Sequence, residues 1–192
     1  DGTHLPAGVT VVNLPPLGHD ASYKLVSHDP ALTVDQATAR RGQMLLEALD
    51  TWSPRVVLIE MYPFGRKKFE FELVPLLDAA AARGDVGADR PLIVCSLRDI
   101  LVNQRSDQAA YDERCSDRAN RWFDAILVHS DPTFARLEDS FRPTTPLRVP
   151  VHDTSATAFR FGLGVRRRAS AGSRGRTVLS GTHAMRTTIT TA

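Results

Sequence analysis

Short runs of apolar residues alternate with longer amphipathic stretches along the first 150 or so residues of the chain. The apolar residues within each run are consecutive, which is typical of strands that are covered on both faces of a parallel sheet. They predict strands at residues 9–14, 55–60, 91–96 and 125–129, with a short fifth strand at 147–151. The alternation predicts an α/β fold with a doubly wound, mostly parallel, Rossmann-like sheet and right-handed crossovers.

The first two intervening stretches have apolar positions at helical spacing. Thr33 and Gln36 form a candidate capping box for a helix that ends before Pro54. In the next stretch, Pro75 lies within the helical pattern of residues 69–80. This second helix is therefore expected either to kink at the proline or to begin near Val74.

Two further helices are predicted later in the chain. Asp107 is a candidate N-cap for a helix whose apolar stripe consists of Tyr111, Cys115, Ala119 and Trp122. Asp131 followed by Pro132 predicts the start of the fourth helix. Residues 15–32, between the first strand and the first helix, are predicted to form a polar loop.

Charge and composition change near residue 152. Of the 24 Lys and Arg residues seven lie beyond that point, whereas of the 22 Asp and Glu residues only Asp153 does. The basic character therefore belongs to the tail, and nucleic acid is not expected as a partner of the folded part. Residues 1–152 are predicted to form one Rossmann-like domain. Residues 153–192, rich in Ser, Thr and Arg, are expected to be disordered or poorly folded; the alternative is a basic arm that contacts RNA or phosphate.

The overall composition, 42% hydrophobic and 24% charged in 192 residues, is that of a soluble globular protein. No apolar run reaches the roughly 18 residues of a membrane-spanning helix. Cys95 and Cys115 show no metal-ligand spacing, so no metal and no cofactor are predicted. The cysteines fit a reducing compartment, and a cytoplasmic location is expected.

Candidate binding residues follow the second predicted strand, because ligands of parallel α/β sheets bind beyond the carboxyl ends of the strands. Gly65 is expected to permit a tight turn, and Arg66, Lys67 and Lys68 follow it where a helix can begin. Basic side chains beside free backbone N–H groups suit a phosphate or pyrophosphate. The alternative is a solvated helix start that happens to be basic.

The next two strands end in further polar side chains. Ser96, Arg98 and Asp99 could orient a hydroxylated or phosphorylated ligand, or could form a locally hydrogen-bonded turn. His129 could be a general base or a structural histidine. The phosphate-binding loop, dinucleotide-binding turn and nucleophile elbow are absent from the sequence, which leaves NTPase, dehydrogenase and hydrolase interpretations unsupported.

Three strings together resemble a known family. EMYPFGRKKFEFELVPLL at 60–77, SLRDIL at 96–101 and WFDAILVHSDP at 122–132 are similar to bacterial predicted glycosyltransferases of GT-B architecture, relatives of the N-acetylglucosaminyltransferase that forms lipid II. The resemblance covers roughly residues 5–150. The positions that match the family motifs are Glu60, Pro63, Phe64, Gly65, Arg66, Ser96, Arg98, Asp99, His129, Asp131 and Pro132.

The resemblance implies transfer of a sugar from a nucleotide diphosphate donor to a hydroxyl acceptor. This chain would supply the acceptor-side domain, with Asp99 and His129 as catalytic candidates and the other strand-end residues as substrate contacts. The first strand and glycine-rich loop of the family, and its donor domain, have no counterpart here. The chain is therefore expected to be an incomplete enzyme, inactive alone, whose tail reflects a truncation, a fragment end or a frameshift. The alternative is a non-catalytic, flavodoxin-like module that binds a phosphorylated ligand or a protein.

Overall fold

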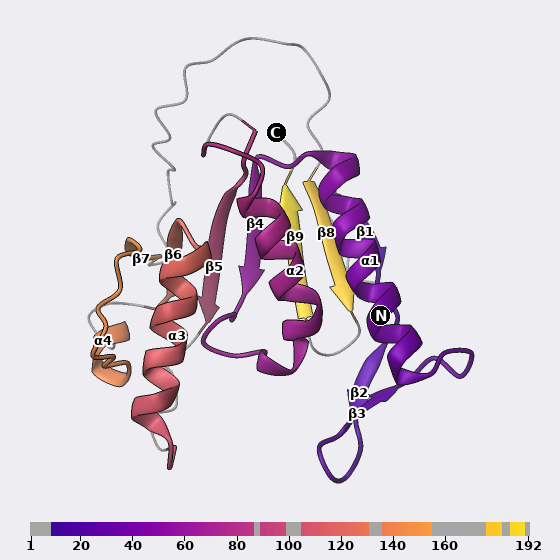
Figure 1. The fold of residues 1–192 in the computed structure, drawn as a ribbon, viewed down its shortest axis with the longest axis horizontal. Helices are drawn as coiled ribbons and strands as arrows, with labels where there is room; N and C mark the ends of the chain where they lie inside the picture. Colours follow the sequence, from indigo (N-terminus) through magenta and orange to yellow (C-terminus); the bar gives the residue numbers. More distant parts are fainter. Residues whose placement is uncertain are drawn as a thin grey trace. The chain divides into compact units, whose positions relative to one another are not determined.

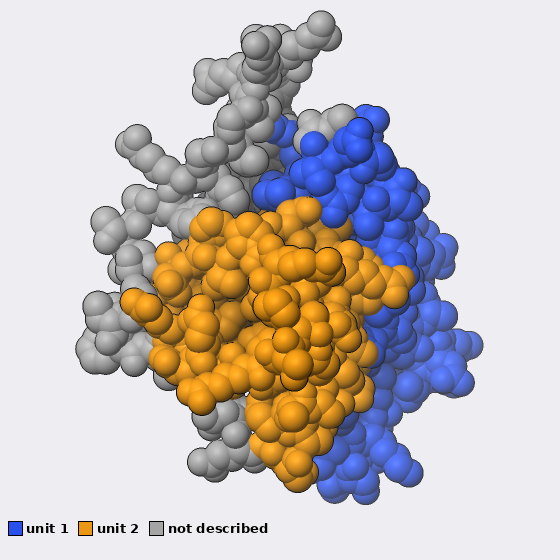
Figure 2. Space-filling model, turned by 60° about the vertical axis from the view of Figure 1, so that its left-hand side comes forward, with its two compact units in different colours: residues 1–58, 68–92, 168–192 blue, residues 59–67, 93–167 orange. Residues whose placement is uncertain are grey.

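The computed structural model describes residues 9–86, 89–98, 105–130, 136–154, 176–181 and 185–190, the last two stretches as backbone alone. The predicted α/β class is confirmed, because a four-stranded parallel sheet is flanked by helices (Figure 1). The chain divides into two compact units (Figure 2). The first comprises residues 1–58, 68–92 and 168–192, and the second comprises residues 59–67 and 93–167.

The strands of the first unit follow the order β1-β8-β9-β4. They are β1 (Val9–Asn13), β8 (Arg176–Gly181), β9 (Met185–Thr190) and the first residues of β4 (Val56–Glu60). β1 pairs with β8 in parallel, and β8 pairs with β9 in antiparallel orientation. Most of the tail for which disorder was predicted, residues 153–192, lies outside the described residues, and β8 and β9 are the strands described within it.

The first helix, α1 (Val34–Trp52), confirms the predicted capping box. The Gln36 amide donates to Thr33 Oγ1 at 3.2 Å, and the Thr33 amide donates to Gln36 Oε1 at 2.9 Å. The helix ends at Ser53, whose left-handed backbone (φ 37°) stops it before Pro54. Both ends of α1 are therefore determined by local sequence.

The second helix, α2 (Glu70–Ala81), follows a 3-10 turn at Lys67–Phe69 and continues through Pro75. The predicted alternative start near Val74 is wrong. Proline removes only one hydrogen bond from the second turn of a helix, and burial of three side chains of this helix, Leu73, Leu76 and Leu77, outweighs that loss.

A buried ion pair joins α1 to α2. Arg41 Nε and Nη2 each donate to the Glu72 carboxylate at 2.7 Å, and Arg41 Nη1 donates to the Pro15 carbonyl at 2.9 Å. The Arg41 and Glu72 side chains are 2% and 0% exposed. Arg41 thereby ties both helices to the segment that follows β1.

The predicted polar loop at 15–32 contains a small antiparallel hairpin, so the prediction of a loop is wrong for the residues of its two strands. Its strands, β2 (Leu17–His19) and β3 (Leu25–Ser27), have three residues each, too few to show a periodic pattern. The Asp20 carboxylate closes the turn by accepting from the Ser22 and Lys24 amides, each at 2.8 Å.

The second unit contains the last residues of β4 followed by β5 (Leu92–Arg98), β6 (Ala125–His129) and β7 (Val151–Asp153). β5 pairs in parallel with β6, and β6 with β7. Two helices of this unit are α3 (Gln108–Trp122) and α4 (Leu137–Ser140). The central strands β5 and β6 are buried almost throughout, as their continuous apolar runs predict.

Two local predictions in this unit are corrected. The fifth strand was expected at 147–151 but begins at Val151, because Asn120 of α3 holds the preceding segment by accepting from the Arg148 amide at 2.7 Å and donating to the Pro146 carbonyl at 3.0 Å. Asp107 stands at the N-cap of α3, yet its carboxylate makes no capping bond and pairs with Arg114 at 3.0 Å.

Candidate functional site

Polar side chains at the carboxyl ends of neighbouring strands contact one another in the second unit. Glu60, at the end of β4, forms an ion pair with Arg98, at the end of β5. Ser96 Oγ of β5 lies 2.8 Å from His129 Nε2 at the end of β6. Arg98 and His129 are also opposite each other in the parallel register. We call these four residues, together with Thr154, the strand-end cluster.

Thr154, just after β7, completes a directional chain of hydrogen bonds. Its Oγ1 lies 3.3 Å from the Val128 carbonyl, to which it donates, and 2.7 Å from His129 Nδ1. The threonine oxygen then accepts from Nδ1–H, which leaves Nε2 to accept from the Ser96 hydroxyl. This assignment satisfies every group in the chain of hydrogen bonds and fixes the orientation of the His129 ring.

The strand-end cluster combines a buried and an open part. Ser96 is 9% exposed, and Glu60 is mostly buried, with its side chain 15% exposed. His129 is exposed, and 61% of the Arg98 side chain is accessible. An imidazole oriented by two hydroxyls and a guanidinium anchored by a carboxylate therefore face solvent. Such an arrangement can take a proton from a hydroxyl group and attract negative charge.

The loop that follows β4 differs from the expected glycine turn. The left-handed residues are Met61 (φ 68°) and Arg66 (φ 60°), whereas Gly65 has no positive φ, and a Cβ placed on it would meet Met61 at an ordinary 3.5 Å. Gly65 is therefore not required for the turn. The Phe64 ring is 2% exposed and packs edge-on against Phe141, with centroids 5.1 Å apart, so this predicted substrate contact lies in the core.

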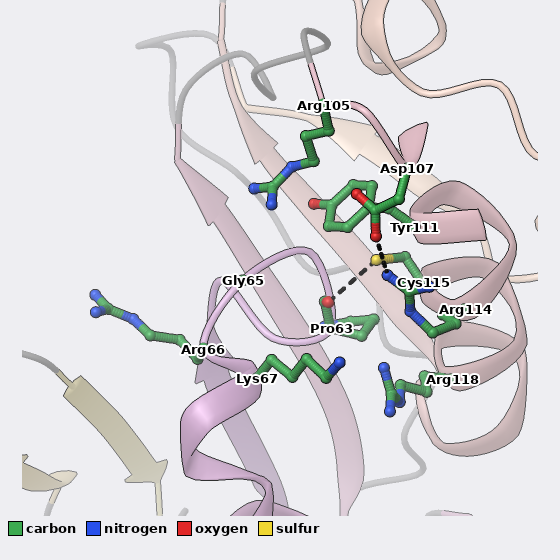
Figure 3. A pocket seen from close by; sticks show the side chains of 10 residues that line it. All are labelled: Pro63, Gly65, Arg66, Lys67, Arg105, Asp107, Tyr111, Arg114, Cys115 and Arg118. Carbon is green, nitrogen blue, oxygen red and sulfur yellow. Dashed lines mark hydrogen bonds and ion pairs between the residues drawn. The ribbon is translucent and has the colours of Figure 1, made fainter. Parts of the chain in front are cut away.

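A cavity of about 310 Å³ lies between this loop and α3 (Figure 3). The loop contributes three of the predicted site residues to its lining, Pro63, Gly65 and Arg66. The other lining residues are Lys67, Arg105, Asp107, Tyr111, Arg114, Cys115 and Arg118. The predicted site residues that the structure describes thus fall into two groups, the strand-end cluster and the lining of this cavity, with Phe64 in the core.

Two hydrogen bonds join α3 to the loop behind the cavity. The Cys115 thiol donates to the Pro63 carbonyl at 3.2 Å, and the Tyr111 hydroxyl donates to the Phe64 carbonyl. Burial raises the pKa of Cys115 to about 11 and also raises the pKa of Tyr111. The hydrogen bond from Arg114 lowers the pKa of Asp107. At neutral pH the thiol and phenol are therefore uncharged, and Asp107 is an ionised partner of Arg114.

Some predicted residues lie outside the described part of the chain, namely Asp99, Asp131 and Pro132. Lys68 is described but does not line the cavity, and its ammonium donates to the Tyr23 carbonyl in the first unit. Cys95 is fully buried in β5, as expected for a small core side chain.

Sequence reasoning missed Thr154 and the charged face of α3. Thr154 carries no pattern of its own, because only the pairing of β6 with β7 brings it to His129. The basic side chains of α3 did leave a signal: Arg114 and Arg118 are four residues apart, so both lie on one helix face next to the predicted apolar stripe.

Comparisons of the chain with protein-family models, with curated proteins and with solved structures gave no match. Among the described helices, none has the length and apolarity needed to cross a bilayer. Within the same part of the chain, His, Cys, Asp and Glu side chains do not gather in groups of three or more that could hold a metal ion.

Proposed function

We propose that this chain is the acceptor-side domain of a GT-B glycosyltransferase, which moves a sugar from a nucleotide diphosphate donor to a hydroxyl acceptor. The observation that carries the proposal is the Ser96–His129–Thr154 hydrogen-bond chain at the carboxyl ends of adjacent parallel strands. Parallel α/β sheets bind ligands at that edge, and each of the resembling sequence strings includes residues at it.

In the proposed reaction His129 is the general base. The acceptor O–H gives its proton to Ser96 Oγ as the Ser96 hydroxyl proton moves to His129 Nε2. The acceptor oxygen then bonds to the anomeric carbon of the donor sugar. The bond from that carbon to the diphosphate breaks, and the diphosphate leaves with the electron pair. Thr154 stabilises the imidazolium by accepting from Nδ1–H.

The ion pair of the strand-end cluster has a separate role in this proposal. Glu60 holds the Arg98 guanidinium at the edge of the sheet, where more than half of that side chain is exposed. A guanidinium fixed in this way is suited to stabilise the negative charge that develops on a leaving diphosphate.

Titration of the purified chain with UDP-, GDP- and dTDP-sugars and with a panel of neutral glycans and polyprenyl-linked sugars tests the proposal. We expect at least one hydroxyl acceptor to bind and to shift the imidazole ¹⁵N signals of His129. His129→Gln should weaken that binding about tenfold, because the Ser96 hydroxyl, which contacts the acceptor, loses the imidazole that orients it. His19→Gln, an exposed histidine of β2, is the matched control and should bind as the parent does.

Two outcomes would contradict the proposal. One is that no acceptor in the panel binds, which would favour a non-catalytic binding module. The other is that an acceptor binds equally well to the parent and to His129→Gln with no change in the His129 signals, which would place the acceptor away from the strand-end cluster.

A further inference from the structure

The cavity between the loop after β4 and α3 has a strongly cationic lining. Five basic side chains contribute to it, Arg66, Lys67, Arg105, Arg114 and Arg118, and the acid among the lining residues is Asp107. Because Asp107 is already paired with Arg114, it offsets little of the remaining positive charge. Like charges gathered around one cavity repel each other, and an anionic ligand relieves that repulsion.

The directions of the side chains identify which cations face the opening. Figure 3 shows the Lys67 ammonium, from the loop, and the Arg118 guanidinium, from α3, pointing into the same space, with Arg114 above them. Arg66 extends away from this group in the same view, and the Arg105 guanidinium stacks 4.4 Å from the centroid of the Tyr111 ring. Lys67 and Arg118 therefore form the anion-facing part of the cavity, with Arg114, paired to Asp107, beside them.

The other lining groups add no competing negative charge. Cys115 and Tyr111 both donate hydrogen bonds to loop carbonyls, and both remain protonated at neutral pH. The same two bonds fix the loop against the helix, so the cations are held by two joined elements. A preformed site of this kind loses little free energy to ordering when a ligand binds.

We propose that this cavity binds the diphosphate group of a ligand. The cations of Lys67 and Arg118 come from two elements and suit the two to three negative charges of a diphosphate, and about 310 Å³ exceeds the space that a single phosphate requires. The inference goes beyond sugar transfer and holds whether or not the chain acts on sugars, since it needs neither a donor nor an acceptor hydroxyl. Nucleotides and diphosphate-bearing lipids or sugars share this group.

Calorimetric titration with inorganic pyrophosphate, phosphate and sulfate tests the site directly. We expect pyrophosphate to bind more tightly than phosphate or sulfate, with an affinity that falls as salt is added. Lys67→Met and Arg118→Met should each weaken pyrophosphate binding about tenfold, the usual effect of losing one charge-assisted contact. UDP and farnesyl diphosphate, titrated in parallel, distinguish a nucleotide source of the diphosphate from a lipid source.

The chain offers a matched control for each variant. Lys68→Met removes the neighbouring lysine, and Arg121→Met removes an exposed arginine of α3; neither residue lines the cavity, so both should change the affinity less than threefold. Absence of pyrophosphate binding, equal binding of sulfate, or equal losses in the control variants would overturn the proposal.

Discussion

At the scale of single residues, the wall of the cavity is fixed by packing rather than by glycine. Met61 and Arg66 hold left-handed backbone conformations, each of which costs a non-glycine residue about 1 kcal/mol. The buried Tyr62 ring between them packs at 6.4 Å from Trp122, and α3 donates to the carbonyls of the loop. These contacts compensate the backbone strain and hold the loop in place.

Cys115 should be unreactive in the folded protein at neutral and mildly basic pH. Its raised pKa, about 11, means that only about 0.1% of the thiol is ionised at pH 8, against about a quarter for a thiol of ordinary pKa. Alkylation by iodoacetamide, followed by mass spectrometry in a Cys95→Ser background, should therefore be very slow at pH 8.

The rate of that alkylation should rise as the pH approaches 11, provided that the fold persists, because the thiolate fraction grows through the raised pKa. Unfolding in guanidinium chloride should restore ordinary reactivity and serves as the control. Alkylation of the folded protein at pH 8 as fast as free cysteine would show that the thiol is neither buried nor bonded to Pro63 as described.

Sequence patterns predicted a side-chain contact correctly where the two residues lie close together in the sequence. Thr33 and Gln36 are three residues apart, and the structure joins them in the predicted reciprocal bonds. Asp107 shows the limit of such reasoning. It has the right residue type and position for an N-cap, yet its carboxylate bonds to Arg114 instead, because a guanidinium is a stronger partner than a backbone amide.

At the scale of elements, the packing of α1 against α2 depends on the buried Arg41–Glu72 pair. Burial raises the pKa of Glu72, and the hydrogen bonds from Arg41 oppose that rise. Glu72→Gln should lower the free energy of unfolding by about 3–5 kcal/mol, because it leaves the Arg41 charge buried without a counter-charge. Urea denaturation followed by circular dichroism measures the change.

The double variant Arg41→Met/Glu72→Leu is the informative comparison. It removes both charges and keeps most of the buried volume, so it should recover most of the stability lost in Glu72→Gln. A single variant as stable as the parent would mean that the pair is open to solvent. A double variant with the same free energy of unfolding as Glu72→Gln would mean that the hydrogen bond from Arg41 to the Pro15 carbonyl contributes more to stability than the neutralisation of the buried charge.

Helices and strands were predictable from the sequence where a long pattern of apolar residues marks them. Continuous apolar runs identified β5 and β6, and the helical spacing of apolar residues identified α1, α2 and α3. The beginning of β7 was misplaced because its preceding segment is tied to Asn120, more than 25 residues earlier. No pattern within residues 147–151 records that contact.

At the scale of the whole molecule, the N-terminal strand depends on a segment from the other end of the chain. In the described strand order β1 lies at the end of the sheet with β8 as its neighbour. Deleting residues 155–192 should therefore speed hydrogen exchange of the β1 amides by tenfold or more, since they lose their partner strand. Hydrogen–deuterium exchange with mass spectrometry reports this region by region.

Amides of β6 are the internal control in that experiment, because β6 pairs with β5 and β7 in the second unit. They should exchange at the parental rate in the deletion variant. Unchanged exchange of β1 would show that its pairing with β8 does not protect it in solution.

By itself the sequence determined the fold class, strands β5 and β6, and the cap of α1. It also determined that polar and charged side chains able to bind or catalyse follow the central strands. Those features depend on neighbours a few positions away, so a local pattern records them. The tertiary structure alone decided that His129 meets Ser96 and Thr154, that the basic face of α3 closes a cavity with the loop after β4, and that Arg41 neutralises Glu72. Each of these joins segments separated by some 25 residues or more, and their geometry is set by strand register and helix packing.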